Sequence, residues 1–114
     1  MADNVVYINV EEGSKRVMNN IKLYSKLITK FKDDNNMAEI EATVTAGDLE
    51  KAQSAVHTMK GLAANLSFTE LFKQSFALET QIKEKNVNPD QLTILKDVFK
   101  ETLNEIDKVI SQYA

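Results

Sequence analysis

Apolar residues recur every three or four positions along most of the chain, the spacing that places them on one face of an α-helix. This pattern predicts helices around residues 21–31, 37–46, 48–66, 71–82 and 92–113. A shorter helix is expected from Asn9 to about Met18, because Asn9 resembles an N-cap with Glu12 three residues later.

Capping and turn residues mark the ends of the longer helices. Residues 33–36 (DDNN) interrupt the apolar pattern, and Gly47 is typical of a helix C-terminus, followed by Asp48 as the next N-cap. Residues 88–91 (NPDQ) place a cap, a proline at the first helical position and a glutamine three residues after the cap. We therefore predict an all-α fold, an antiparallel four-helix bundle with one or two short additional N-terminal helices.

The segment VVYINV, residues 5–10, is the only one with strand character. We interpret it as an extended lead-in rather than a strand, because an isolated strand has no partner in an all-α chain. Residues 1–8 are thus predicted to form an extended N-terminal lead-in. Residues 9–114 are predicted to form one helical bundle domain, since a chain of 114 residues suffices for one core.

Composition narrows the function classes. The chain has no cysteine, which excludes disulfides and thiolate metal sites, and its net charge of −3 with interspersed signs argues against a nucleic-acid partner. The N-terminus lacks a signal pattern, and the longest uninterrupted apolar run, residues 5–8, is far too short to span a membrane. We expect a cytoplasmic monomer that binds neither nucleic acid nor membrane.

The predicted helix 48–66 carries the only histidine. Its apolar residues form one stripe, which consists of Leu49, Ala52, Val56, Met59, Ala63 and Leu66. His57 lies about 130° from the centre of that stripe, on a face shared with Glu50, Ser54 and Gly61. The imidazole is therefore expected on the side of the helix that faces away from the core.

The neighbours of His57 indicate a chemistry. Gly61 costs about 1 kcal/mol relative to alanine inside a helix, and Ser54 and Ala64 are also small, so the ring is expected to stand on a low surface open to another protein. Lys60, one turn away, is placed to bring an ammonium group beside anything attached to the ring. Imidazole is a nucleophile near neutral pH. Together these features indicate that His57 accepts a phosphoryl group.

The sequence HTMKG, residues 57–61, resembles the H-x-x-K-G signature of histidine phosphotransfer (HPt) domains, four-helix modules of multistep two-component phosphorelays. The resemblance covers about residues 9–85 and includes three further segments, VEEGSKRVMNNIKLYSKLITKF, TAGDLEKAQSAVHTMKGLAANL and FALE. Ala64 and Ser67 stand where family members often have further glycines.

The resemblance implies a signalling phosphoprotein that takes a phosphoryl group from the phosphoaspartate of one receiver domain and passes it to the aspartate of another. In that role His57 is the phosphoryl acceptor, Lys60 its charge partner and Gly61 the residue that leaves space for the partner. Glu79 is a candidate to accept a hydrogen bond from the other ring nitrogen, with a solvated helix carboxylate as the alternative. The remaining predicted partner-binding residues are Ser54 and Ala64.

A phosphocarrier without ATP-dependent kinase activity is expected, because the only glycines, at 13, 47 and 61, cannot form a phosphate-cradling loop. We expect this chain to bind no cofactor and the receiver partner to supply Mg²⁺ with its acidic ligands. The expected partners are response-regulator receiver domains, a hybrid sensor kinase or both. They would dock on a partly apolar surface rimmed by Lys51, Lys60 and Lys73.

Three other functions are compatible with a helical bundle. One is an interaction module that binds a partner through the same face without chemistry. Another is the phosphoacceptor domain of a chemotaxis-type histidine kinase, which would receive phosphate from an ATP-binding domain. A bundle that binds haem or a metal is disfavoured, since one histidine without cysteines or clustered carboxylates offers too few ligands.

Overall fold

The computed structural model describes residues 5–113, which form six α-helices and no strand. The helices are α1 (Val10–Lys15), α2 (Ile21–Phe31), α3 (Asn36–Ala46), α4 (Leu49–Leu66), α5 (Thr69–Lys83) and α6 (Pro89–Tyr113). The predicted all-α fold is therefore confirmed over these residues. Residues 5–9 precede α1 without regular structure, while residues 1–4 and 114 of the predicted lead-in and domain lie outside the described residues.

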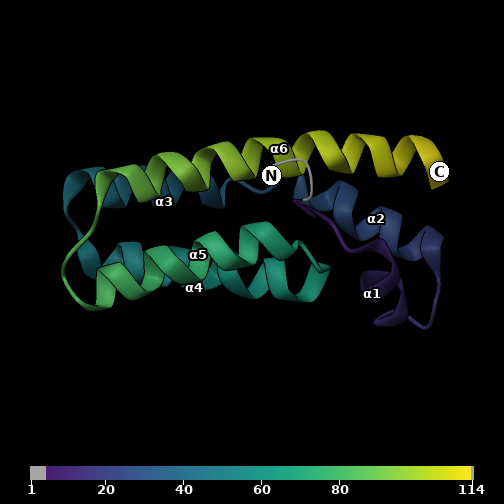
Figure 1. Cartoon of the computed structure of the whole chain (residues 1–114), viewed down its shortest axis with the longest axis horizontal. Coiled ribbons are helices and arrows are strands. Elements are labelled where there is room, and N and C mark those ends of the chain that lie inside the picture. Colours follow the sequence, from purple (N-terminus) through teal and green to yellow (C-terminus); the bar gives the residue numbers. More distant parts are fainter. Residues whose placement is uncertain (1–4, 114) are drawn as a thin grey trace.

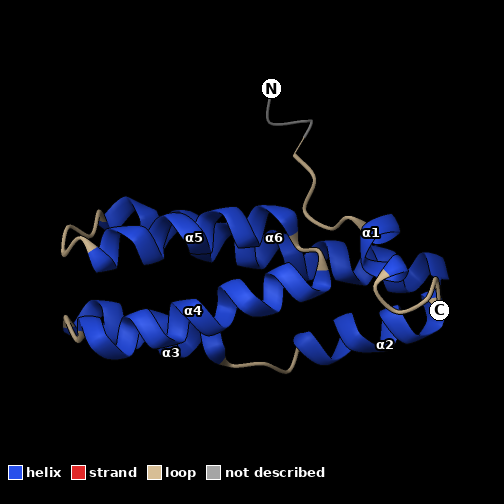
Figure 2. Ribbon diagram, turned by 90° about the horizontal axis from the view of Figure 1, so that it is seen from below, coloured by secondary structure: helices blue, strands red, loops and turns tan. Residues whose placement is uncertain are grey.

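Four helices make up the bundle, in which α3 packs on α4, α4 on α5, α5 on α6 and α6 on α3. The last helix, α6, runs the whole length of the molecule, and α4 and α5 lie side by side along part of it (Figure 1). Helices α2 and α3 follow one another along the edge opposite α5 and α6 (Figure 2). Helix α1 lies at the α2 end of the molecule (Figure 2). The two short N-terminal helices thus extend the bundle beyond the α4–α5 hairpin.

The predicted helix boundaries hold for the longer helices and fail for the first one. Asp48 caps α4 as expected, because its carboxylate accepts a hydrogen bond from the Lys51 backbone N–H at 3.2 Å. The first helix ends at Lys15 rather than near Met18, since Met18 and Asn19 adopt left-handed backbone conformations with φ of 59° and 61°.

Glu12 and Gln91 lie three residues after the N-caps Asn9 and Asn88, but their side-chain oxygens accept hydrogen bonds from other residues. The Glu12 carboxylate accepts a hydrogen bond from the Ser67 hydroxyl at 2.9 Å, which ties α1 to the end of α4. The N–H of Asn88 donates instead to the side-chain oxygen of Gln81 at 2.9 Å. The N-cap of α1 forms as predicted, since the Asn9 side chain accepts a hydrogen bond from the Glu12 backbone N–H at 3.1 Å. The reciprocal bond is absent, because the Asn9 backbone N–H donates to the Ser67 carbonyl instead of the Glu12 side chain.

The apolar stripe of α4 faces the core as predicted. Its central residues are buried, while Leu49 and Leu66 at the two ends are half-buried. At the turn that follows α4, the Phe68 ring meets Phe31 of α2 edge to face, with ring centroids 4.9 Å apart. Helix α4 is thus fixed along one face and leaves the opposite face to solvent.

A close contact between α1 and α2 fixes the C-terminal end of α4. Tyr24 is 1% exposed and its hydroxyl donates a hydrogen bond to the Leu66 carbonyl at 2.5 Å. Burial, with the nearby Glu12 charge, raises the pKa of Tyr24 to about 12. Gly13 lies directly against this ring, where a Cβ would stand 2.3 Å from Cε1. The absence of a side chain at Gly13 therefore lets α1 pack on Tyr24.

We predict that Gly13→Ala lowers the free energy of unfolding by roughly 1–3 kcal/mol, because the new methyl group would displace a Tyr24 ring that is buried and hydrogen-bonded. Gly61→Ala is the matched control. Apart from the backbone of its own helix, no atom of residues 5–113 lies within 4 Å of a Cβ at Gly61, so alanine there should stabilise its helix by about 1 kcal/mol. Urea denaturation of both variants measures the difference, and equal effects at the two positions would contradict the packing described.

Candidate functional site

His57 projects from the middle of α4 into solvent, with 70% of its side chain exposed. Its neighbours on the same face of the helix have small side chains and leave the ring accessible to another protein. Ser54 and Gly61 are exposed and Ala64 is half-buried, and a Cβ on Gly61 would meet nothing within 4 Å. Packing among residues 5–113 therefore does not require a glycine at position 61, although its presence in a helix costs stability.

Helix α5 brings a carboxylate under the imidazole. Glu79 is 4% exposed, and its Oε2 lies 2.9 Å from Nδ1 of His57. An ionised carboxylate only accepts hydrogen bonds, so Nδ1 carries the proton and donates it to Glu79. In the neutral ring, the lone pair of the second nitrogen, Nε2, is then available for chemistry.

Lys60 binds the other oxygen of the same carboxylate. Its Nζ lies 2.6 Å from Oε1 of Glu79, its side chain is 22% exposed, and it sits 5.3 Å from the centroid of the Phe76 ring. Lys83 adds a second positive charge at 3.9 Å from Oε2. The ammonium of Lys60 is thus held next to the imidazole by Glu79.

The surroundings of Glu79 keep it ionised. Burial alone would raise its pKa, but the hydrogen bonds from Lys60 and His57, with the charges of Lys60 and Lys83, outweigh burial and lower the pKa below 4.5. The solvated-carboxylate alternative for Glu79 does not describe this structure, because the side chain is buried between α4 and α5.

Phe76, the first residue of the FALE segment, belongs to this surface, although the sequence analysis did not identify it as a site residue. It is 53% exposed on α5, three residues before Glu79, and its ring packs on Phe72 with centroids 6.2 Å apart. The sequence feature that could have indicated its exposure is its position outside the buried stripe of Leu71, Leu78 and Ile82. An exposed aromatic beside the His57 site indicates a contact surface for a protein.

The structure also locates the other predicted surface residues. Lys51 and Lys73 are both exposed, on α4 and α5. A groove of about 240 Å³ is lined by Ala64, Phe72, Thr69 and Arg16, the residue that follows α1. The face that carries His57 is therefore continuous with a concavity at the α1 end of the hairpin.

Two negative findings concern residues 5–113. No group of three or more His, Cys, Asp or Glu side chains in this range is arranged to hold a metal ion. None of its helices combines the length and the apolar character needed to cross a membrane.

Comparison with known proteins gives one match. The model of a family described as the Hpt domain matches residues 26–111, which is most of the chain. No curated protein and no solved structure matches.

We predict that Glu79→Gln lowers the free energy of unfolding by roughly 1–3 kcal/mol at neutral pH, because the half-buried Lys60 ammonium loses its charged partner. The folded-state pKa of Glu79 lies below the ordinary value of 4.5, so the ionised carboxylate stabilises the fold fully above pH 4.5. That stabilisation is lost as the pH falls through the lower, folded-state pKa.

Denaturation of the wild type and the variant between pH 7 and pH 3 should therefore show a stability difference that narrows as the pH falls below 4.5. A difference that stays constant over this range would show that the charge of Glu79 does not stabilise the fold.

Proposed function

The chain belongs to the Hpt domain family, whose members carry out histidine phosphotransfer in phosphorelays, and we propose that His57 is the residue that carries the phosphoryl group. Hpt domains are phosphocarriers without kinase activity, and they interact with receiver domains and kinases. The contact between Nδ1 of His57 and the buried Glu79 supports this assignment, because it orients an exposed ring and directs reactivity to Nε2.

In the proposed transfer, the Nε2 lone pair attacks the phosphorus of a receiver's aspartyl phosphate. The bond between phosphorus and the aspartate oxygen breaks, and the aspartate leaves as a carboxylate with the bonding electrons. The ring keeps its Nδ1 proton and becomes positively charged, and the Glu79 carboxylate 2.9 Å from Nδ1 balances that charge. The reverse reaction delivers the phosphoryl group to the aspartate of another receiver.

Lys60 contributes positive charge to the same site. Its ammonium is fixed by Glu79 one helical turn from His57, so a phosphoryl group on Nε2 gains a nearby cation. The receiver supplies Mg²⁺ and the carboxylates that bind it. This chain thus provides the oriented nucleophile and one cation.

The proposed receiver contact is small and transient, near 1,000 Å² in all. Gly61, Ser54 and Ala64 let the receiver surface approach the ring closely, and Phe76 offers an apolar anchor beside it. The chain itself acts as a monomer in the cytoplasm.

The first test is phosphate uptake from a phosphorylated receiver domain. The wild type should acquire an acid-labile, alkali-stable label, and His57→Gln should acquire none while its circular dichroism and melting temperature stay close to those of the wild type. Because His57 is the only histidine, an acid-labile label on the variant would refute the assignment.

A second test concerns the open space at Gly61. Gly61→Gln should slow transfer between about tenfold and a hundredfold, since a displacement near the reacting atoms of about 1 Å has effects of this size. Thr93→Gln, at an exposed position of α6, is the control and should transfer at the rate of the wild type. Unchanged transfer by Gly61→Gln would show that the receiver does not approach this face closely.

A further inference from the structure

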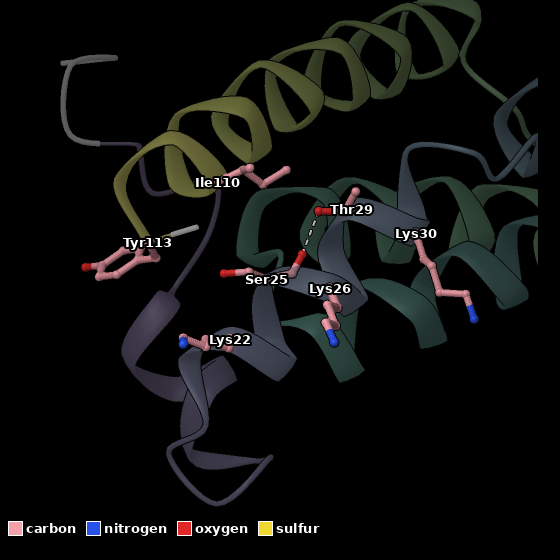
Figure 3. Close-up of a pocket in the computed structure, with 7 residues that line it drawn as sticks. All are labelled: Lys22, Ser25, Lys26, Thr29, Lys30, Ile110 and Tyr113. Atoms are coloured by element: carbon pink, nitrogen blue, oxygen red, sulfur yellow. Dashed lines mark hydrogen bonds between the residues drawn. The ribbon is translucent and has the colours of Figure 1, made fainter.

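A second concave surface lies between α2 and the last turns of α6, and none of its residues belongs to α4 or α5 (Figure 3). We call it the α2–α6 groove; its volume is about 560 Å³ and it is lined by five α2 residues between Lys22 and Lys30 and by Ile110 and Tyr113 of α6. The groove is larger than the concavity at the α1 end of the α4–α5 hairpin, and the proposed phosphotransfer does not use it.

The floor of the groove presents carbon rather than hydrogen-bonding groups. The Thr29 hydroxyl donates to the Ser25 carbonyl at 2.7 Å (Figure 3). The Ser25 side chain is buried. Ile110 is half-buried and Tyr113 is exposed on the α6 side. An occupant of this groove therefore needs an apolar face.

A row of positive charge follows the groove along α2. Lys22, Lys26 and Lys30 are spaced four residues apart, so the row extends about 12 Å along the helix. All three are exposed, and none forms an ion pair within the described residues, whereas Lys32 in the same region pairs with Asp107. An uncompensated row of this kind is notable in a chain with a net charge of −3.

We propose that the α2–α6 groove binds an amphipathic helix of a partner protein, with apolar residues on one face and carboxylates along its flank. A row of lysines that spans two helical turns matches carboxylates repeated every four residues, whereas a single small anion needs only one cation. This binding site is separate from His57, and the proposal does not depend on phosphotransfer.

A second copy of this chain fits the groove less well. Its own acidic row, Asp97, Glu101 and Glu105 of α6, has the matching four-residue spacing. That row points about 150° away from Ile110 and Tyr113 around the helix axis. Two copies related by a twofold axis therefore cannot satisfy both rows in a closed dimer.

The test uses a synthetic helical peptide of about 18 residues with leucines on one face and glutamates every fourth residue along the flank. Titrated into the isotope-labelled protein, it should shift backbone amide NMR signals of α2 and of the end of α6 and leave those around His57 unchanged. A peptide with glutamine in place of glutamate should bind about tenfold more weakly, and added salt should weaken the acidic peptide.

Protein variants locate the interaction. Lys22→Gln/Lys26→Gln should lose about tenfold in affinity for the acidic peptide, while Lys85→Gln/Lys100→Gln, which removes the same charge elsewhere, should bind like the wild type. Both variants should accept phosphate normally, which separates this proposal from the role of His57.

Equal binding of the two peptides, or no shifts at the groove, would overturn the proposal. Shifts that appear on raising the protein concentration without peptide would identify a second copy as the occupant and overturn it as well. Octanoate that shifts the same signals as strongly as the peptide would identify a small amphiphile instead.

Discussion

The carboxylate of Glu79 joins the two side chains on which the proposed chemistry depends. One of its oxygens accepts from Nδ1 of His57 and the other from Nζ of Lys60, so a single buried group orients the ring and holds the cation beside it. The carboxylate itself is buried, whereas the imidazole that it binds is exposed to solvent. In the proposed mechanism the same carboxylate also balances the charge that the ring gains on phosphorylation.

The rest of the fold keeps α4 and α5 in the register that this site requires. The buried stripe of α4 fixes its rotation, and Tyr24 holds its C-terminal end through Leu66 while Gly13 lets α1 close over that ring. The N-terminal helices thereby support the hairpin from one end, and α2 together with α6 forms the α2–α6 groove. Helix α6 spans both parts, so the proposed receiver surface and the proposed partner groove lie on one helical molecule.

Helical spacing alone was enough to predict the long helices, the buried stripe of α4 and the position of His57 outside it. It was not enough to establish that Glu79 is buried, because that depends on how α5 packs on α4, and a single sequence carries no direct record of that register. For the same reason, the sequence did not predict that Phe76 is exposed beside the His57 site or that Lys60 binds Glu79. The first helix ended early for a different reason, since Met18 and Asn19 adopt left-handed conformations that spacing does not reveal.

The role of Glu79 is tested most directly by ¹⁵N NMR of the His57 ring before and after phosphorylation. We expect the neutral ring to carry its proton on Nδ1 and the phosphorus to be attached to Nε2. Phosphorus attached to Nδ1, the nitrogen that faces Glu79, would contradict the proposed mechanism.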